Sequence, residues 1–182
     1  RATGVKGVLR WALEKYSIFN LAKISIEFIQ KLCQNKEKLK YILKLLQEDP
    51  YYLLYLPNLV FGSQRLRSSI NFWVEGGKVR YAVSPSPKVS RVFLEHGVPV
   101  RCHESVLRYF LAVAVAMLNP LDCYMGEPAV PIVRRRSRGE STRVIMYSRD
   151  FDYDCGMSYG EELINVLTRE LLDKLEEKVM HI

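Results

Sequence analysis

The sequence predicts an α+β protein, and three patterns lead to this prediction. Apolar residues recur at helical spacing through the first third of the chain, residues 69–83 alternate around a pair of glycines, and the apolar segment 104–118 precedes the β-branched run 144–147. With 48% hydrophobic and 11% aromatic residues over 182 positions, the chain can form a core, and disorder is excluded.

The first element is a helix that begins near Gly4. Its apolar positions recur every three or four residues: Val5, Val8, Leu9, Ala12, Leu13 and Tyr16. Lys6 and Arg10 lie four apart, so both project from one polar face near a helix N-terminus, where free N–H groups favour anions. We predict a phosphate site there; the alternative is an ordinary amphipathic helix with two solvated cations.

Residues 21–47 continue as two or three packed helices that separate near Asn35 and end at Asp49-Pro50. We expect no chemistry from this region. Tyr51, Tyr52 and Tyr55 follow, and although tyrosines can stack on RNA bases, we favour core packing.

A β-hairpin is predicted after a bend at Phe61-Gly62. Strand 69–74 and the positions Val79, Tyr81 and Val83 flank Gly76-Gly77, which suits a two-residue turn. Arg65 and Arg67 lie in the loop before the first strand. We expect a loop over 84–88 and one or two short strands around His96-Gly97.

The second half contains the most basic stretch of the chain. A buried helix over Glu104–Leu118 and a loop over 121–131 precede Arg134, Arg135, Arg136 and Arg138, which run into Gly139 and the strand 144–147. Guanidinium groups at a surface loop bind phosphate bidentately. We therefore predict a phosphate-binding loop; the alternative is a solvated charge run.

The charge balance favours a polyanionic partner. Lys plus Arg number 27 against 20 Asp plus Glu, a net charge of +7, whereas residues 161–178 are net acidic. We divide the chain into a binding domain over 1–148 and, over 149–182, an acidic turn with an amphipathic helix that docks on the domain or on a neighbour.

We expect a soluble cytoplasmic protein without a cofactor. The longest apolar run, Phe110–Leu118, is too short for a membrane span. The spacing of Cys33, Cys102, Cys123 and Cys155 fits neither a zinc ribbon nor a thioredoxin-type motif, so we expect reduced core thiols.

The order helix, hairpin, helix, loop and strand matches five of the six elements of the ferredoxin-like βαββαβ pattern. The fold class is thus α+β, ferredoxin-like or RRM-like, with a helical insertion and a C-terminal helix. The first strand of the pattern is missing from this sequence. We expect that it precedes Gly4 or is supplied by another route.

Three stretches resemble the CRISPR RAMP superfamily. The family's glycine-lysine-glycine helix start resembles Gly4-Val-Lys-Gly-Val-Leu-Arg-Trp. Its Phe-Gly-Ser segment is similar to Phe61-Gly62-Ser63, which is followed by Arg67-Ser68-Ser69. Its late glycine-rich loop is similar to Arg135-Arg136-Ser137-Arg138-Gly139. Among the subfamilies, Trp11 and the Arg-Ser-Arg-Gly run most resemble the first or sixth RAMP subunit of type III-B Cmr effector complexes.

The resemblance implies an RNA-binding structural subunit of an antiviral effector ribonucleoprotein. It would contact the guide RNA or the guide-target duplex through the phosphate backbone, and its partners would be guide RNA, target RNA and other RAMP subunits. The basic side chains named above would form one groove, with phosphate contacts that give affinity and little sequence preference.

Two other classes of function stay open. Asp150, Asp152 and Asp154 could hold Mg²⁺ for RNA cleavage, although aspartates are common in turns, and we favour a role without catalysis. Cys102-His103-Glu104 is a weaker metal or nucleophile candidate at a helix start, for which we favour a structural role. The third class is a protein-interaction module whose arginines bind an acidic partner.

Overall fold

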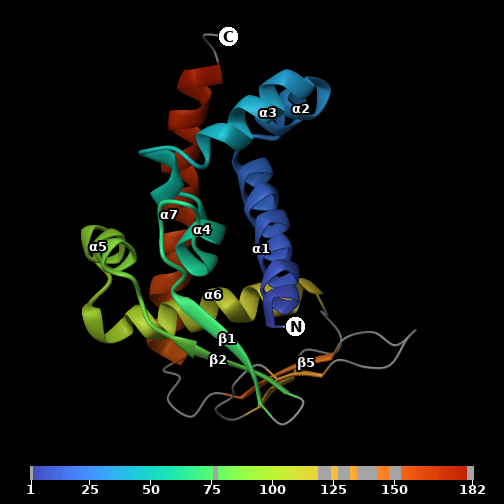
Figure 1. Ribbon diagram of the computed structural model, residues 1–182. Coiled ribbons are helices and arrows are strands. Elements are labelled where there is room, and N and C mark those ends of the chain that lie inside the picture. The colour runs from blue at the N-terminus through green and yellow to red at the C-terminus, as the bar shows by residue number, and fades with distance from the viewer. Residues whose placement is uncertain are drawn as a thin grey trace.

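The structure, a computed structural model, describes residues 2–75, 78–118, 124–126, 132–134, 143–147 and 153–179. It confirms an α+β protein. The helices are α1 (Ala2–Ile24), α2 (Ile26–Gln34), α3 (Lys36–Leu45), α4 (Leu56–Phe61), α5 (Pro87–Glu95), α6 (His103–Leu118) and α7 (Tyr153–Val179), with 3₁₀ turns at Tyr51–Leu53 and Val100–Cys102. The strands are β1 (Ile70–Glu75), β2 (Lys78–Val83), β3 (Tyr124–Gly126), β4 (Ile132–Arg134) and β5 (Arg143–Tyr147). Figure 1 shows α6 running across between the strands and the upright helices α1 and α7.

The helices of the N-terminal third begin and end where polar side chains can satisfy free backbone groups. Ser25 caps α2 by accepting a hydrogen bond from the amide of Phe28. Asn35 then ends α2 and caps α3, accepting from the amides of Glu37 and Lys38. The predicted break near Asn35 is therefore confirmed. Val8, predicted on the core face of α1, is instead exposed.

The described strands form one sheet in the order β1-β2-β4-β5-β3. The hairpin prediction is confirmed, because β1 and β2 are antiparallel and the pair Glu75↔Lys78 leaves only Gly76 and Gly77, outside the described residues, to make the turn. β4 is antiparallel to both β2 and β5, and β3 is parallel to β5. The strand predicted at 144–147 is confirmed within β5, whereas β3 lies in the segment expected to be a loop.

Helix α5 ends at Glu95 and His96-Gly97 form a turn after it, so our prediction of short strands there was wrong. Ser86 accepts a hydrogen bond from the amide of Val89 and so caps α5, and Pro87 occupies the first turn, where its missing N–H costs nothing. Val89, Val92 and Phe93 then face the core. Their spacing of three and one is typical of a helix. We did not predict a helix because two prolines precede these residues and favoured a loop.

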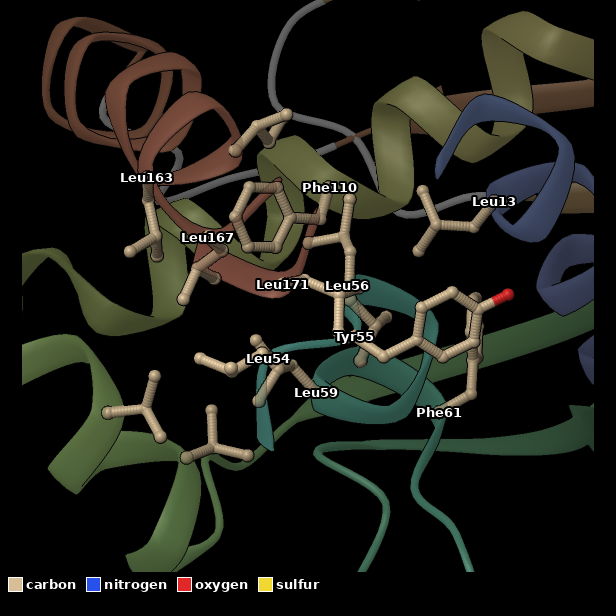
Figure 2. Close-up of a cluster of buried hydrophobic side chains, with 14 of the residues drawn as sticks. Leu13, Leu54, Tyr55, Leu56, Leu59, Phe61, Phe110, Leu163, Leu167 and Leu171 are labelled. Carbon is tan, nitrogen blue, oxygen red and sulfur yellow. The ribbon is translucent and has the colours of Figure 1, made fainter. Parts of the chain in front are cut away.

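The core lies where α1, α4, α6 and α7 meet (Figure 2). α7 docks on α6 and α1 of the same chain, and its predicted apolar side is buried: Leu163, Leu167, Leu171, Leu175 and Val179. Tyr51, Tyr52 and Tyr55 are buried too, which confirms core packing. A Cβ atom on Gly160 of α7 would clash with Cδ2 of Tyr109 on α6. The two helices can approach this closely because position 160 has no side chain.

The cysteines differ from the expectation of reduced core thiols. Cys102, at the start of α6, and Cys155, in the first turn of α7, form a disulfide with Cα atoms 5.7 Å apart. Cys33 is free and exposed, and Cys123 lies outside the described residues. Of the helices that the structure describes, none combines the length and apolarity that crossing a membrane requires.

Candidate nucleic-acid interface

The β1–β2 hairpin has one face turned to the helices and one face turned to solvent. Ile70 of β1 and Tyr81 of β2 are buried on the inner face. The alternate positions Asn71, Trp73, Glu75, Arg80 and Ala82 are exposed. This alternation with period two leaves a polar and aromatic outer face on the hairpin.

Trp73, Glu75 and Arg80 form a small cluster on this outer face. Trp73 and Arg80 are cross-strand partners, and Trp73 is 41% exposed. The Trp73 Nε1–H donates to Oε2 of Glu75 at 3.4 Å, and Nη1 of Arg80 lies 3.2 Å from the same oxygen. An accessible indole beside a guanidinium can stack on a base and contact a phosphate.

Our sequence reasoning did not select Trp73 or Arg80. The signal was nevertheless present, because a tryptophan occupied the polar phase of an alternating strand, where aromatic side chains are not needed for the core. An arginine directly opposite strengthens this signal.

Arg65 and Arg67 are exposed in the loop between α4 and β1, as predicted. The Arg67 guanidinium donates to the carbonyls of Ser68 and Pro85, each at 3.4 Å, which are long contacts at the surface. The loop itself is fixed, because Lys88 Nζ donates to the Arg65 carbonyl at 3.2 Å. Both arginines thus lie where β1 begins and β2 ends.

The arginine cluster begins at the opposite end of the hairpin. Val133 pairs with Val79, and β4 runs antiparallel to β2. Arg134, the last residue of β4, therefore lies near the end of β2 that is next to the β1–β2 turn. Arg134 belongs to a strand and not to the predicted loop, and it pairs with Arg143. Arg135, Arg136, Arg138 and Gly139 lie outside the described residues.

Arg65 and Arg67 are therefore separated from Arg134 by the length of the hairpin. The six residues of β1 span roughly 15–20 Å at about 3.3 Å per residue. Trp73 and Arg80 lie between these ends, on the exposed face. The basic residues described on this surface thus follow the length of the hairpin in a strip: Arg65, Arg67, Arg80 and Arg134. They are not gathered around one point.

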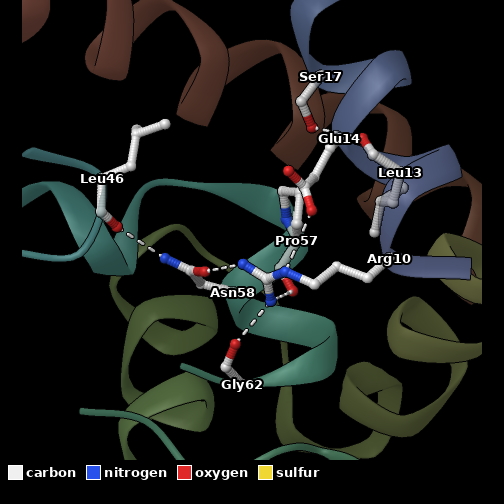
Figure 3. Close-up of polar contacts among 8 residues, drawn as sticks. All are labelled: Arg10, Leu13, Glu14, Ser17, Leu46, Pro57, Asn58 and Gly62. Carbon is white, nitrogen blue, oxygen red and sulfur yellow. Dashed lines mark hydrogen bonds and ion pairs between the residues drawn. The ribbon is translucent and has the colours of Figure 1, made fainter. Parts of the chain in front are cut away.

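Arg10, which we expected at a phosphate site, makes several contacts within the fold (Figure 3). Its Nη1 donates to the Gly62 carbonyl at 2.7 Å and its Nη2 to Oδ1 of Asn58 at 2.6 Å. Its Nε lies 3.2 Å from Oε1 of Glu14. Asn58 is fully buried and in turn donates to the carbonyls of Leu46 and Tyr52. Arg10 thus ties α1 to α4 and to the Phe-Gly-Ser bend.

Lys6 lies one turn before Arg10 on α1 and is partly buried. This burial lowers the pKa of Lys6, and the nearby charge of Arg10 lowers it further. Two cations one turn apart thus lie on this face of α1, and the guanidinium of Arg10 is already engaged by Asn58, Gly62 and Glu14.

The candidate catalytic groups are not assembled within the described residues. Asp154 is exposed in the first turn of α7, in a helix and not in the predicted turn, while Asp150 and Asp152 lie outside the described residues. The described residues contain no group of three potential metal ligands from His, Cys, Asp and Glu. His103 is buried, with Nε2 2.9 Å from the Val98 carbonyl, which fits the structural role that we favoured.

Comparison with protein families gives one match that covers nearly the whole chain. Residues 1–177 match the family described as RAMPs, the RAMP superfamily. Comparisons with curated proteins and with solved structures gave no match. The family match spans both the Arg10–Gly62 contact and the β1–β2 hairpin, and this chain belongs to the RAMP superfamily.

Proposed function

We propose that the chain is an RNA-binding structural subunit of a type III, Cmr-like CRISPR effector ribonucleoprotein. Membership of the RAMP superfamily supports a place in such a complex. The net charge of +7 supports a polyanionic partner. The observation that carries the proposal is the exposed outer face of the β1–β2 hairpin, with Trp73 and Arg80 between Arg65 and Arg67 at one end and Arg134 at the other.

The RNA backbone would follow this strip from one end of the hairpin to the other. Arg65 and Arg67 would hold phosphates at the start of β1, and Arg134, the last residue of β4, would hold them at the far end. The strip is long enough for several phosphates, which are spaced at about 3.4 Å along the axis of a helical strand. Contacts of this kind accept any sequence, as a subunit that carries varied guides requires.

A ferredoxin-like arrangement also agrees with the strand order. In the βαββαβ pattern, the first strand lies beside the second strand of the hairpin and is antiparallel to it. β4 occupies this place next to β2, with β5 beyond it. The missing first strand would therefore be replaced by β4, while residues 1–148 supply the RNA-binding domain and residues 149–182 supply α7.

Binding of a labelled single-stranded RNA of twenty nucleotides, measured by fluorescence anisotropy across a salt series, tests the proposal. We expect the double variant Arg65→Ala/Arg67→Ala to lower the slope of log K against log salt by about 1.5, since each phosphate contact on a single strand contributes about 0.7. We expect Trp73→Ala to weaken binding by about 1–3 kcal/mol through lost stacking.

Arg169→Ala is the matched control, because Arg169 is an exposed arginine on α7, far along the chain from the hairpin. It should change neither the affinity nor the slope appreciably. A slope near zero for the unmodified chain, or equal losses for Arg169→Ala and for the hairpin variants, would contradict the proposed path.

A further inference from the structure

The outward side of α1 exposes large apolar side chains in a continuous stripe. Val8, Trp11, Ile18 and Phe19 are each 49–55% exposed, and together with Lys15 they recur at spacings of three and four residues. This spacing places all five on one side of the helix, opposite the buried Leu9 and Leu13. We call these five residues the α1 face.

The α1 face is larger than scattered surface residues would produce. With side-chain areas on the order of 150–250 Å² and exposed fractions near one half, its four apolar members offer about 400 Å². A patch of this size is typical of the largest apolar patch on a monomer, which is often functional. At its N-terminal end, a Cβ on Gly4 or Gly7 would meet no atom within 4 Å, so the surface there is open and flat.

The charges of the α1 face are positive. Lys15 Nζ lies 4.2 Å from the centroid of the Trp11 ring, and Lys23 Nζ lies 4.6 Å from that of Phe19. The carboxylate nearest in sequence, Glu14, is directed away toward Arg10. The stripe is therefore apolar, with ammonium groups held against its two aromatic rings and the Glu14 carboxylate directed toward Arg10.

We propose that the α1 face docks an apolar segment with an excess of carboxylates from a different protein subunit. Half-exposed Val8 and Ile18 require an apolar partner surface, and Lys15 and Lys23 require carboxylates beside it. The proposal concerns a surface separate from the hairpin strip and goes beyond the proposed RNA contact.

Two other occupants fit the α1 face less well. RNA offers no partner for the aliphatic side chains, and Lys15 already covers one side of the Trp11 ring. The same face of a second copy would place lysines against lysines, and like charges in contact disfavour association. An acidic segment of another subunit satisfies both the apolar area and the charge.

Photocrosslinking in the native host tests the proposal. The full chain would carry benzoylphenylalanine in place of Ile18, with a second sample carrying it in place of Leu94, which is similarly exposed on α5. We expect the position-18 probe to attach to one segment of a different polypeptide, in which apolar residues alternate with an excess of Asp and Glu. The sites of attachment are mapped by mass spectrometry.

Charge reversal supplies the second measurement. The double variant Lys15→Glu/Lys23→Glu should lower the cross-link yield at position 18 by about tenfold or more, because it opposes carboxylates with carboxylates. Trp73→Ala should leave that yield unchanged, because Trp73 lies on the hairpin and not on the α1 face. The RNA proposal and this proposal can therefore fail independently of each other. Thermal unfolding of each purified variant verifies that its fold is retained.

The proposal is overturned by any of four results: attachment to RNA, attachment to another copy of this chain, attachment to a segment without excess carboxylates, or a yield at position 18 no higher than at position 94. A yield that survives the double charge reversal in a folded chain would overturn it as well.

Discussion

Replacing Arg10 tests most directly whether this predicted phosphate-binding residue stabilises the fold. Replacing it by methionine keeps an unbranched apolar stem but removes the guanidinium. The Gly62 carbonyl and Oδ1 of buried Asn58 then lose charge-assisted hydrogen bonds of 2.7 and 2.6 Å. Each such bond contributes about 1.5–3 kcal/mol, so we expect a loss of about 3–6 kcal/mol in the free energy of unfolding.

The contact with Glu14 adds little to this value. It is an i,i+4 pair at 3.2 Å with both side chains partly exposed, and such pairs contribute about 0.3–0.5 kcal/mol. The total loss should lower the melting temperature by about 10 °C in a domain of this size. Urea unfolding followed by far-ultraviolet circular dichroism measures the free energy directly.

Arg10→Lys distinguishes the fork geometry from the charge alone. Lysine keeps the charge but cannot reach Asn58 and Gly62 with two parallel donors, so we expect it to recover less than half of the loss. Arg65→Met is the matched control at an exposed arginine and should change stability by no more than about 0.5 kcal/mol. A loss below about 1 kcal/mol for Arg10→Met would refute the structural role.

Three further predictions concern the helix contact, a buried tyrosine and the disulfide. Gly160→Ala should cost about 2–3 kcal/mol in a urea titration, because the new methyl group would clash with the Tyr109 ring. Burial raises the Tyr81 pKa to about 12, despite the opposing charge of Arg108, whereas unfolding restores the ordinary pKa of 10. The unfolded chain therefore loses the Tyr81 proton first, and the free energy of unfolding falls as pH rises from 10 to 12. Tyr81→Phe should make this fall smaller. Reducing Cys102–Cys155, whose sequence separation is 53, should cost about 4 kcal/mol by loop entropy, measured as a lower melting temperature in dithiothreitol.

Each of these has a matched control. Gly7→Ala also adds a methyl group to a helix but meets no atom within 4 Å, so it should stabilise the chain by about 0.5–1 kcal/mol. A Tyr81→Phe chain that loses stability above pH 10 as steeply as the parent would contradict the assignment. A Cys102→Ala/Cys155→Ala chain should be insensitive to dithiothreitol, and an equal response in both chains would count against the disulfide.

The helices and the hairpin could be predicted because their signals are local. Asn35 is a strong cap, Gly76-Gly77 can make only a tight turn, and the leucines of α7 repeat every four residues. α5 was missed because prolines before it were interpreted only as loop residues, although proline is favoured in the first turn of a helix.

The partners of the charged and sulfur-containing side chains could not be predicted in this way. Arg10 and Gly62 are 52 positions apart, and nothing local to either residue indicates that a buried asparagine completes their contact. Cys102 and Cys155 are likewise brought together only by the docking of α7 on α6. Trp73, by contrast, was accessible to sequence reasoning, since the alternation of β1 already placed it on the outer face.

The contact between α1 and α7 also has a consequence for folding during translation. Leu9 and Leu13 share a core with Leu163 and Leu167, so α1 emerges from the ribosome about 130 residues before the helix that covers it. At 5–20 residues per second, this interval is roughly 7–25 s. The helices α4 and α6, which also pack against α1, are made within this interval, so only the side of α1 that faces α7 stays uncovered until α7 is made.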